Sequence, residues 1–184
     1  MNPLLKKSIQ LLSFAAIAGT LQASTFVLDK VNSSIAIDVK ATGDSFTGQL
    51  NSYTAVIQGN KSSKKPSKVT FDWDFSDLKT GKDKRDAKMI SWLESKTKGH
   101  FVLSTFTKRT DGRMWAKGEM TIHGVKQTVE FPVKVIAKSG KMTIRGTATI
   151  DTRKFSLPVI KMIGLFKVDP LVKVRFSLRG KIKG

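Results

Sequence analysis

The chain has 184 residues, with 33 Lys and Arg against 14 Asp and Glu, a formal net charge of +19 and no cysteine. Its 40% hydrophobic composition is ordinary for a folded core and too high for a disordered polycation, and its length suits a single domain. Without cysteine, the chain cannot form a disulfide, a thiolate zinc site, an iron–sulfur cluster or a cysteine nucleophile.

Residues 1–23 have the features of a signal peptide. Lys6 and Lys7 form a basic start, residues 9–18 form an apolar stretch, and Leu21-Gln22-Ala23 is a tolerable cleavage site. The apolar stretch is well short of the ~20 residues that a membrane-spanning helix needs, which disfavours the alternative of a retained anchor. We therefore expect a cleaved signal peptide and an exported domain over residues 24–184.

Most of the exported domain has a period-two pattern, which predicts strands with one buried face. In chain order, the apolar positions are Ile35, Ile37 and Val39; Tyr53, Ala55 and Ile57; Val69, Phe71, Trp73 and Phe75; Met120 and Ile122; Val129, Phe131, Val133 and Val135; Met142, Ile144, Ala148 and Ile150; and Val172, Val174, Phe176, Leu178, Gly180 and Ile182. The last segment is the longest, and its intervening positions are mostly Lys and Arg.

Three segments depart from this pattern. Residues 83–95 predict a short helix, with Asp83 and Asp86 near its start, where a carboxylate favours the helix dipole. Residues 61–68 form a Lys/Ser/Pro linker too short to divide domains, and residues 155–166 are apolar without alternation, as in a loop or a single helical turn. About eight to ten short-connected strands suggest a sandwich or a closed barrel, and an eight-stranded barrel is either filled by side chains or holds one slender ligand.

Catalytic and metal-binding motifs fail when they are tested. Gly43-Asp44-Ser45-Phe46 imitates the start of a lipase motif, but neither His100 nor His123 follows an aspartate at the required spacing of three, so a turn is expected. The two histidines have no paired spacing for zinc. The cluster of Asp72, Asp74 and Asp77 lacks the spaced ligands and the turn glycine of a calcium loop. We predict no catalytic residue, metal ligand or cofactor.

The last strand carries a cationic stripe along one outward edge. Alternate residues in a strand lie ~6.6 Å apart, which aligns Lys173, Arg175, Arg179, Lys181 and Lys183. Nucleic-acid modules add stacking aromatics beside such charge, whereas the aromatics here have the opposite parity, so no nucleic-acid partner is expected. An anionic membrane surface, which attracts basic residues by ~1 kcal/mol each, fits better, and solubility alone is the alternative.

Several blocks resemble the YceI-like polyisoprenoid-binding family. Residues 118–133 read GEMTIHGVKQTVEFPV, which is similar to the family's most specific hairpin. Residues 85–89 (RDAKM) with 92–93 (WL) resemble its short helix, residues 150–155 (IDTRKF) resemble a strand end, and residues 46–50 (FTGQL) resemble a turn. The chain departs from the family pattern at Lys98-Gly99, Lys88 and Ser156, which concern the rim of the cavity and hence the choice of ligand headgroup.

The resemblance implies an all-β fold, a lipocalin-like extended antiparallel β-barrel of about eight strands with one short helix. It further implies a periplasmic, non-enzymatic protein whose interior holds a long-chain isoprenoid, a quinone or a fatty-acid derivative. The rival interpretation is an interaction protein in which the basic face binds a polyanion or a membrane and the barrel has no lipid cavity. Edge-strand pairing suggests a homodimer.

If the barrel is hollow, inward-facing apolar side chains would bind the tail at ~0.8 kcal/mol per buried methylene. The expected ligand-binding residues are Ile37, Phe71, Trp73, Phe75, Met89, Trp92, Ile122, Phe131, Val133, Ile144, Phe155, Ile160, Phe166 and Phe176. The alternative for this set is a collapsed, ligand-free core. Residues 157–166, with Met89 and Trp92, are the candidate portal, and the residues expected at a membrane or polyanion are Lys161, Lys167, Lys173, Arg175, Arg179 and Lys181.

Overall fold

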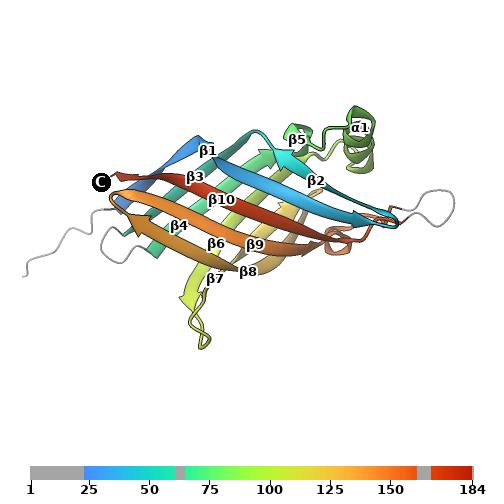
Figure 1. Ribbon diagram of the computed structural model, residues 1–184. Helices are drawn as coiled ribbons and strands as arrows, with labels where there is room; N and C mark the ends of the chain where they lie inside the picture. The colour runs from blue at the N-terminus through green and yellow to red at the C-terminus, as the bar shows by residue number, and fades with distance from the viewer. Residues whose placement is uncertain (1–22, 61–64, 161–166, 184) are drawn as a thin grey trace, which may run out of the picture.

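A computed structural model describes residues 23–60, 65–160 and 167–183 (Figure 1). Its strands are β1 (Ala23–Ala41), β2 (Asp44–Leu50), β3 (Tyr53–Asn60), β4 (Lys65–Asp74), β5 (Leu78–Lys79), β6 (Lys98–Lys108), β7 (Met114–Ile122), β8 (Val125–Lys138), β9 (Lys141–Asp151) and β10 (Leu171–Lys183). The helix α1 spans Asp83–Trp92, and two single turns of 3₁₀-helix, η1 and η2, span Phe75–Asp77 and Thr152–Phe155. Among the described residues, no helix is long and apolar enough to cross a bilayer.

The strands form a closed antiparallel barrel. Neighbours follow the order β10, β9, β8, β7, β6, β4, β3 and β1, and β10 also pairs with β1, which closes a ring of eight strands. The strands β2 and β5 continue the sheet beyond β1 at the end of the barrel that carries α1. Closure confirms the expected barrel and excludes the sandwich. It also pairs the first and last strands with each other, so the homodimer through a free edge gains no support.

Closure is uneven along β1. This strand pairs with β10 from Thr25 to Asp38, across an irregularity between Asp29 and Ser34. By contrast, its described pairing with β3 is confined to residues 23–25 opposite residues 58–60, after which β1 moves on to pair with β2. We call this short pairing the β1–β3 seam.

Most predicted segments are confirmed, with three corrections. The helix ends at Trp92 and not at Ser95, because Glu94 and Ser95 have left-handed backbone conformations, with φ of 47° and 65°. Residues 65–68 belong to β4, so the linker is shorter than predicted. Residues 152–155 form the single turn η2, which overlaps the non-alternating stretch only at its start. The predicted signal peptide lies outside the described residues except for Ala23.

Two glycines allow aromatic rings to lie directly on the neighbouring backbone. A Cβ atom at Gly99 would overlap the Trp73 ring, and one at Gly146 would overlap the Phe176 ring. Both rings line the barrel interior. Glycine at these positions is therefore required by close packing, and it fixes where these two rings lie.

Candidate binding cavity

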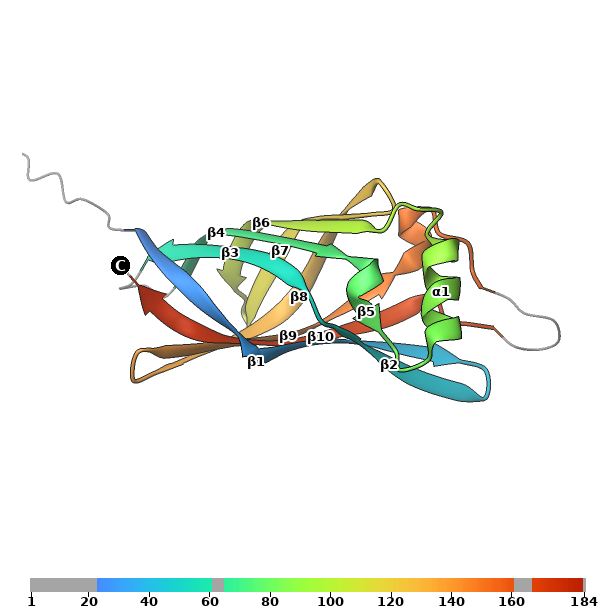
Figure 2. The ribbon, with the colours of Figure 1, turned by 90° about the horizontal axis from the view of Figure 1, so that it is seen from above.

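The barrel encloses an elongated cavity of about 1020 Å³. Its walls draw on all eight barrel strands, and they run from Ser24 and Ile182 near the C-terminal end to Thr152 and Val168 near α1. Figure 2 shows these two ends, with α1 lying across one of them and the C-terminus at the other. Ligand pockets usually occupy ~300–1,000 Å³, so this volume lies at the upper end of the range. The interior therefore contains a cavity, as expected, and the alternative of a collapsed core is not favoured.

The residues predicted to bind a ligand lie in the cavity wall. Every described residue of the predicted ligand-binding set lines the cavity, namely Ile37, Phe71, Trp73, Phe75, Met89, Trp92, Ile122, Phe131, Val133, Ile144, Phe155, Ile160 and Phe176. Phe166 lies outside the described residues. Contact of these side chains with a ligand stays a prediction.

Aromatic rings give much of the wall a fixed shape. Ring centroids are 5.0 Å apart between Tyr53 and Phe71, 5.7 Å between Phe71 and Trp73, and 5.9 Å between Trp73 and Phe75. Tyr53 supports Phe71 without lining the cavity itself. A second series joins Phe101, Phe131 and Phe176, with spacings of 5.7 Å and 5.8 Å. Tilted and edge-on pairs at these distances each contribute ~0.5–1.5 kcal/mol beyond burial, so the rings stabilise one another along the wall.

The helix α1 is anchored across one end of the cavity at both of its ends. At its start, Asp86 is buried and accepts hydrogen bonds from the backbone N–H and the hydroxyl of Thr80, with the hydroxyl 2.6 Å from Oδ1. At its end, Trp92 Nε1 donates to the carbonyl of Pro158 at 3.0 Å. Leu93 follows the helix and is only 1% exposed. The predicted portal residues Met89 and Trp92 therefore belong to a firmly held closure, which brings them to the cavity.

The proposed portal segment is described only in part. Ile160 lines the cavity and its carbonyl accepts a hydrogen bond from the Val168 N–H at 3.0 Å. Lys167 is exposed, and its carbonyl accepts from the Thr42 N–H at 2.9 Å. Lys161 and the rest of residues 161–166 lie outside the described residues. The turn expected at the Gly-Asp-Ser-Phe motif is correct only for Gly43, which lies between β1 and β2 with φ 75°. Residues 44–50 form β2, so the turn expected over residues 46–50 is wrong.

The departures from the family pattern have structural explanations. The Lys98 ammonium lies 2.7 Å from an Asp74 carboxylate oxygen and holds the pKa of that carboxyl well below its usual range, while Gly99 makes room for Trp73. Ser156 takes the left-handed conformation, φ 57°, that a glycine would adopt with less strain. Lys88 lines the cavity from α1.

The cationic stripe lies on the outer face of the barrel and not at an edge, because β10 pairs with both β9 and β1. Lys173, Arg179 and Lys181 are exposed, as predicted. Arg175 is different: its Nε and Nη2 donate to the two carboxylate oxygens of Asp38 at 2.5 and 2.7 Å. This pairing lowers the pKa of Asp38 from 3.8 to about 2. One charge of the stripe is thus already neutralised within the molecule.

Sequence reasoning missed part of the wall. Phe26, on the first half of β1, and Phe46, on β2, both line the cavity. Arg85 was quoted for its motif and also lines the cavity, although it was not predicted to bind anything. A basic residue on a short exposed helix gives no signal in the hydrophobic pattern.

A closed antiparallel barrel around one apolar cavity, with a short helix across an end, defines a class of β-barrels that enclose a binding chamber. Within this class, the chain belongs to the YceI-like family, because the family's model, a YceI-like domain, matches residues 26–179.

Solved structures agree with this assignment at the level of the fold. BcnA of Burkholderia cenocepacia superposes with a TM-score of 0.74 at 19% identity, covering 84% of this chain and 100% of that one. A polyisoprenoid binding domain from Saccharophagus degradans, implicated in plant cell wall breakdown, gives 0.65 at 13% identity, covering 87% and 98%. The Campylobacter jejuni YCEI protein gives 0.62 at 15% identity, covering 74% and 85%. No curated protein matches the sequence.

Proposed function

We propose that this protein is an exported, non-enzymatic binding protein that holds a long-chain amphiphile in its barrel. The observation that carries the proposal is the preformed apolar cavity of about 1020 Å³. The Saccharophagus degradans relative of the same fold is described as binding a polyisoprenoid, which supports a lipid of this kind as the guest. A polyisoprenoid, a quinone and a fatty-acid derivative all fit this description.

The cavity has room for a long tail. At the ~30 Å³ that a water molecule occupies in the liquid, and taking a methylene as similar in size, 1020 Å³ corresponds to about 34 such groups. Burial contributes ~0.8 kcal/mol per methylene, so 20 carbons offer about 16 kcal/mol. This free energy of burial is larger than the ~4–15 kcal/mol that association costs. The preformed wall keeps the additional cost of ordering the protein low.

Such a carrier is useful in a watery compartment. The hydrophobic free energy that holds a tail in the barrel also makes it unfavourable for the free lipid to cross water. The predicted signal peptide would place the protein in the periplasm, between two membranes, where transport, storage and protection of a lipid all require such a container. Exposed lysines of the stripe would add attraction to an anionic surface.

The test is a search for the guest itself. Protein expressed in its own host and purified without detergent is examined by native mass spectrometry and then by organic extraction. We expect a mass above that of the chain and an extracted hydrophobic molecule in near-equal molar amount. The proposal would be refuted if the protein had the mass of the polypeptide alone and also failed to take up a C20 isoprenoid from vesicles. Salt-sensitive vesicle binding by that bare chain would favour the basic-surface interpretation.

A further inference from the structure

One cationic side chain at the cavity lacks the partners that its position demands. Arg85 lies on α1 and lines the cavity, and its Nη1 is buried with no hydrogen-bond partner among the described residues. Its guanidinium lies 3.9 Å from the centroid of the Phe46 ring, which holds it in place without neutralising its charge. A buried donor without an acceptor is costly, and the Arg85 side chain that carries this donor lines the cavity through its other atoms.

The neighbouring carboxylate cannot complete Arg85. Asp86 follows it on α1, but successive side chains of a helix do not face each other, and the Asp86 carboxylate accepts its hydrogen bonds from the N–H and the hydroxyl of Thr80. Those bonds fix the first turn of the helix to the end of β5. Asp86 therefore acts as a positioning residue: it sets the orientation of α1 and leaves Arg85 directed to the cavity.

The charge around Arg85 is predominantly positive. We define the α1 mouth as the end of the cavity lined by Lys82, Lys84, Arg85 and Lys88, with Phe46 beside them. Two acidic residues, Asp44 and Asp169, also line the cavity. Asp83 and Asp86 also lie on α1, but neither lines the cavity. The side chains that line this end therefore carry four positive charges against two negative ones.

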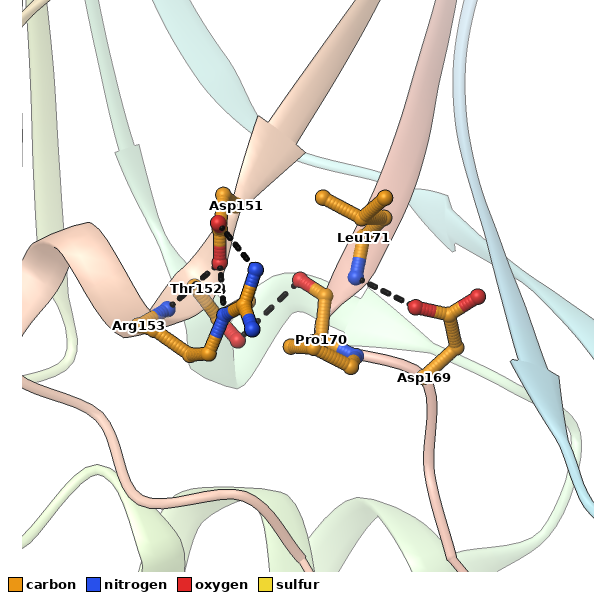
Figure 3. A network of polar contacts seen from close by, with 6 residues as sticks. All are labelled: Asp151, Thr152, Arg153, Asp169, Pro170 and Leu171. Carbon is orange, nitrogen blue, oxygen red and sulfur yellow. Dashed lines mark hydrogen bonds and ion pairs between the residues drawn. The ribbon is translucent and has the colours of Figure 1, made fainter.

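The acidic groups near this end are already engaged. Asp169 accepts the N–H of Leu171 at 2.8 Å, and Asp151 accepts Nε and Nη2 of Arg153 at 2.8 and 2.7 Å, as Figure 3 shows. Asp44 accepts the N–H of Ser45 at 2.8 Å. Thr152 joins η2 to the start of β10, because its N–H and its hydroxyl both donate to the Pro170 carbonyl, at 3.0 and 3.2 Å. None of these contacts between described residues involves a cation of α1.

We infer that the α1 mouth selects amphiphiles with an anionic headgroup, a phosphate or a carboxylate, and that Arg85 is the specificity-determining residue. The inference rests on the proposed function and adds the class and orientation of the ligand: the tail lies along the barrel and the headgroup lies against α1. An arginine fork matches the oxygens of a phosphate or carboxylate in pairs, and such charge-assisted bonds are among the strongest in proteins. The lysines add long-range attraction.

The test compares two ligands with one tail. Full-length, delipidated protein is titrated with geranylgeranyl monophosphate and with geranylgeraniol at fixed pH and ionic strength. Binding is followed by the fluorescence of Trp73 and Trp92, which line the cavity. A third titration uses inorganic phosphate alone, which separates a lipid headgroup from a free anion.

The variants are Arg85→Met, which keeps an apolar stem and removes the charge, and Arg85→Lys, which keeps the charge without the fork. The matched control is Arg109→Met: this arginine also stacks on an aromatic ring, 3.7 Å from the centroid of Trp115, but it does not line the cavity. Thermal unfolding of each variant shows that it is folded before it is titrated.

We expect wild type and Arg109→Met to prefer the phosphate by about tenfold or more. Arg85→Met loses that preference and keeps the affinity for the alcohol, Arg85→Lys retains part of it, and inorganic phosphate binds weakly. Equal wild-type affinity for the two lipids overturns the inference and leaves lipid binding intact, whereas binding of neither overturns the proposed function as well. Three other results would also overturn the inference. The preference for the phosphate over the alcohol could persist in Arg85→Met, it could fall in Arg109→Met, or millimolar inorganic phosphate could abolish it. The wild-type comparison stands even if an Arg85 variant fails to fold.

Discussion

Replacing Ala148 with phenylalanine should shorten the longest tail that the barrel accepts. Ala148 is on β9, is 3% exposed and lines the cavity. The substitution adds six ring carbons to a space that holds about 34 methylene-sized groups. A ligand that fills the cavity must withdraw about as many carbons, which at ~0.8 kcal/mol each is at most about 5 kcal/mol. Half of that value, about 2.5 kcal/mol, lowers affinity about 60-fold.

The assay is a chain-length series with one headgroup, from 12 to 40 carbons. Wild-type affinity should rise with length until the cavity is full, and Ala148→Phe should reach its plateau about six carbons earlier while binding the short members normally. Thr149→Phe is the control, because Thr149 is the next residue on the same strand and is exposed on the outer face. Identical plateaus, or an equal loss at every length, would refute the idea that the guest fills this space. Thermal unfolding checks that overpacking, typically ~1–3 kcal/mol, has not disrupted the barrel.

Three further substitutions test the framework around the cavity. Leu93→Ala, at a side chain 1% exposed, should lower the free energy of unfolding by about 2–5 kcal/mol in urea titrations, and a loss below about 1 kcal/mol would contradict its place in the core. Gly99→Ala should displace the Trp73 ring, with a cost of about 1–3 kcal/mol and a shifted tryptophan emission; unchanged emission would show that the ring does not depend on this glycine. Asp38→Asn tests a pH dependence. Ionised Asp38 has a lowered pKa, so its pair with Arg175 stabilises the fold fully above pH 3.8 and is lost as the pH falls through about 2. The difference in thermal stability between wild type and Asp38→Asn should therefore shrink from pH 5 to pH 2. Because the pair is partly exposed, that difference should stay below ~1 kcal/mol at pH 5, and growth toward pH 2 is the contrary result.

The strands that could be predicted are those in which the alternation is unbroken. The aromatic face of β4 and the long alternation of β10 each place apolar side chains inward at every second residue, and the structure confirms both faces. The pattern missed β6 and the first half of β1, because the register changes within each of these strands. The pairing of β6 shifts between Leu103 and Thr105, and that of β1 shifts between Asp29 and Ser34. Each irregularity moves the apolar residues to the other parity, so a period of two cannot be followed through it.

The polar part of the site depends on contacts between distant segments, which a pattern does not contain. Arg85 is a cavity residue only because Asp86 reaches Thr80 and because Phe46, on a separate strand, supports the guanidinium. The stripe on β10 was correct in its parity, but the loss of one free charge follows from the register that sets β1 beside β10 and brings Asp38 to Arg175. Local chemistry predicts which side chains face inward, and pairing across the sheet decides which charges are left without a partner.

The β1–β3 seam gives the barrel a line of weakness. Interstrand hydrogen bonds hold the other walls over longer stretches, whereas the described pairing of β1 with β3 ends after residues 23–25. The local opening that costs the least free energy begins where the fewest interstrand hydrogen bonds must break. The barrel wall should therefore open transiently at the seam more often than between other strands. Amide protons at the ends of β1 and β3 that form the seam should accordingly exchange with deuterated water sooner than those of β8, which is bonded along both of its edges.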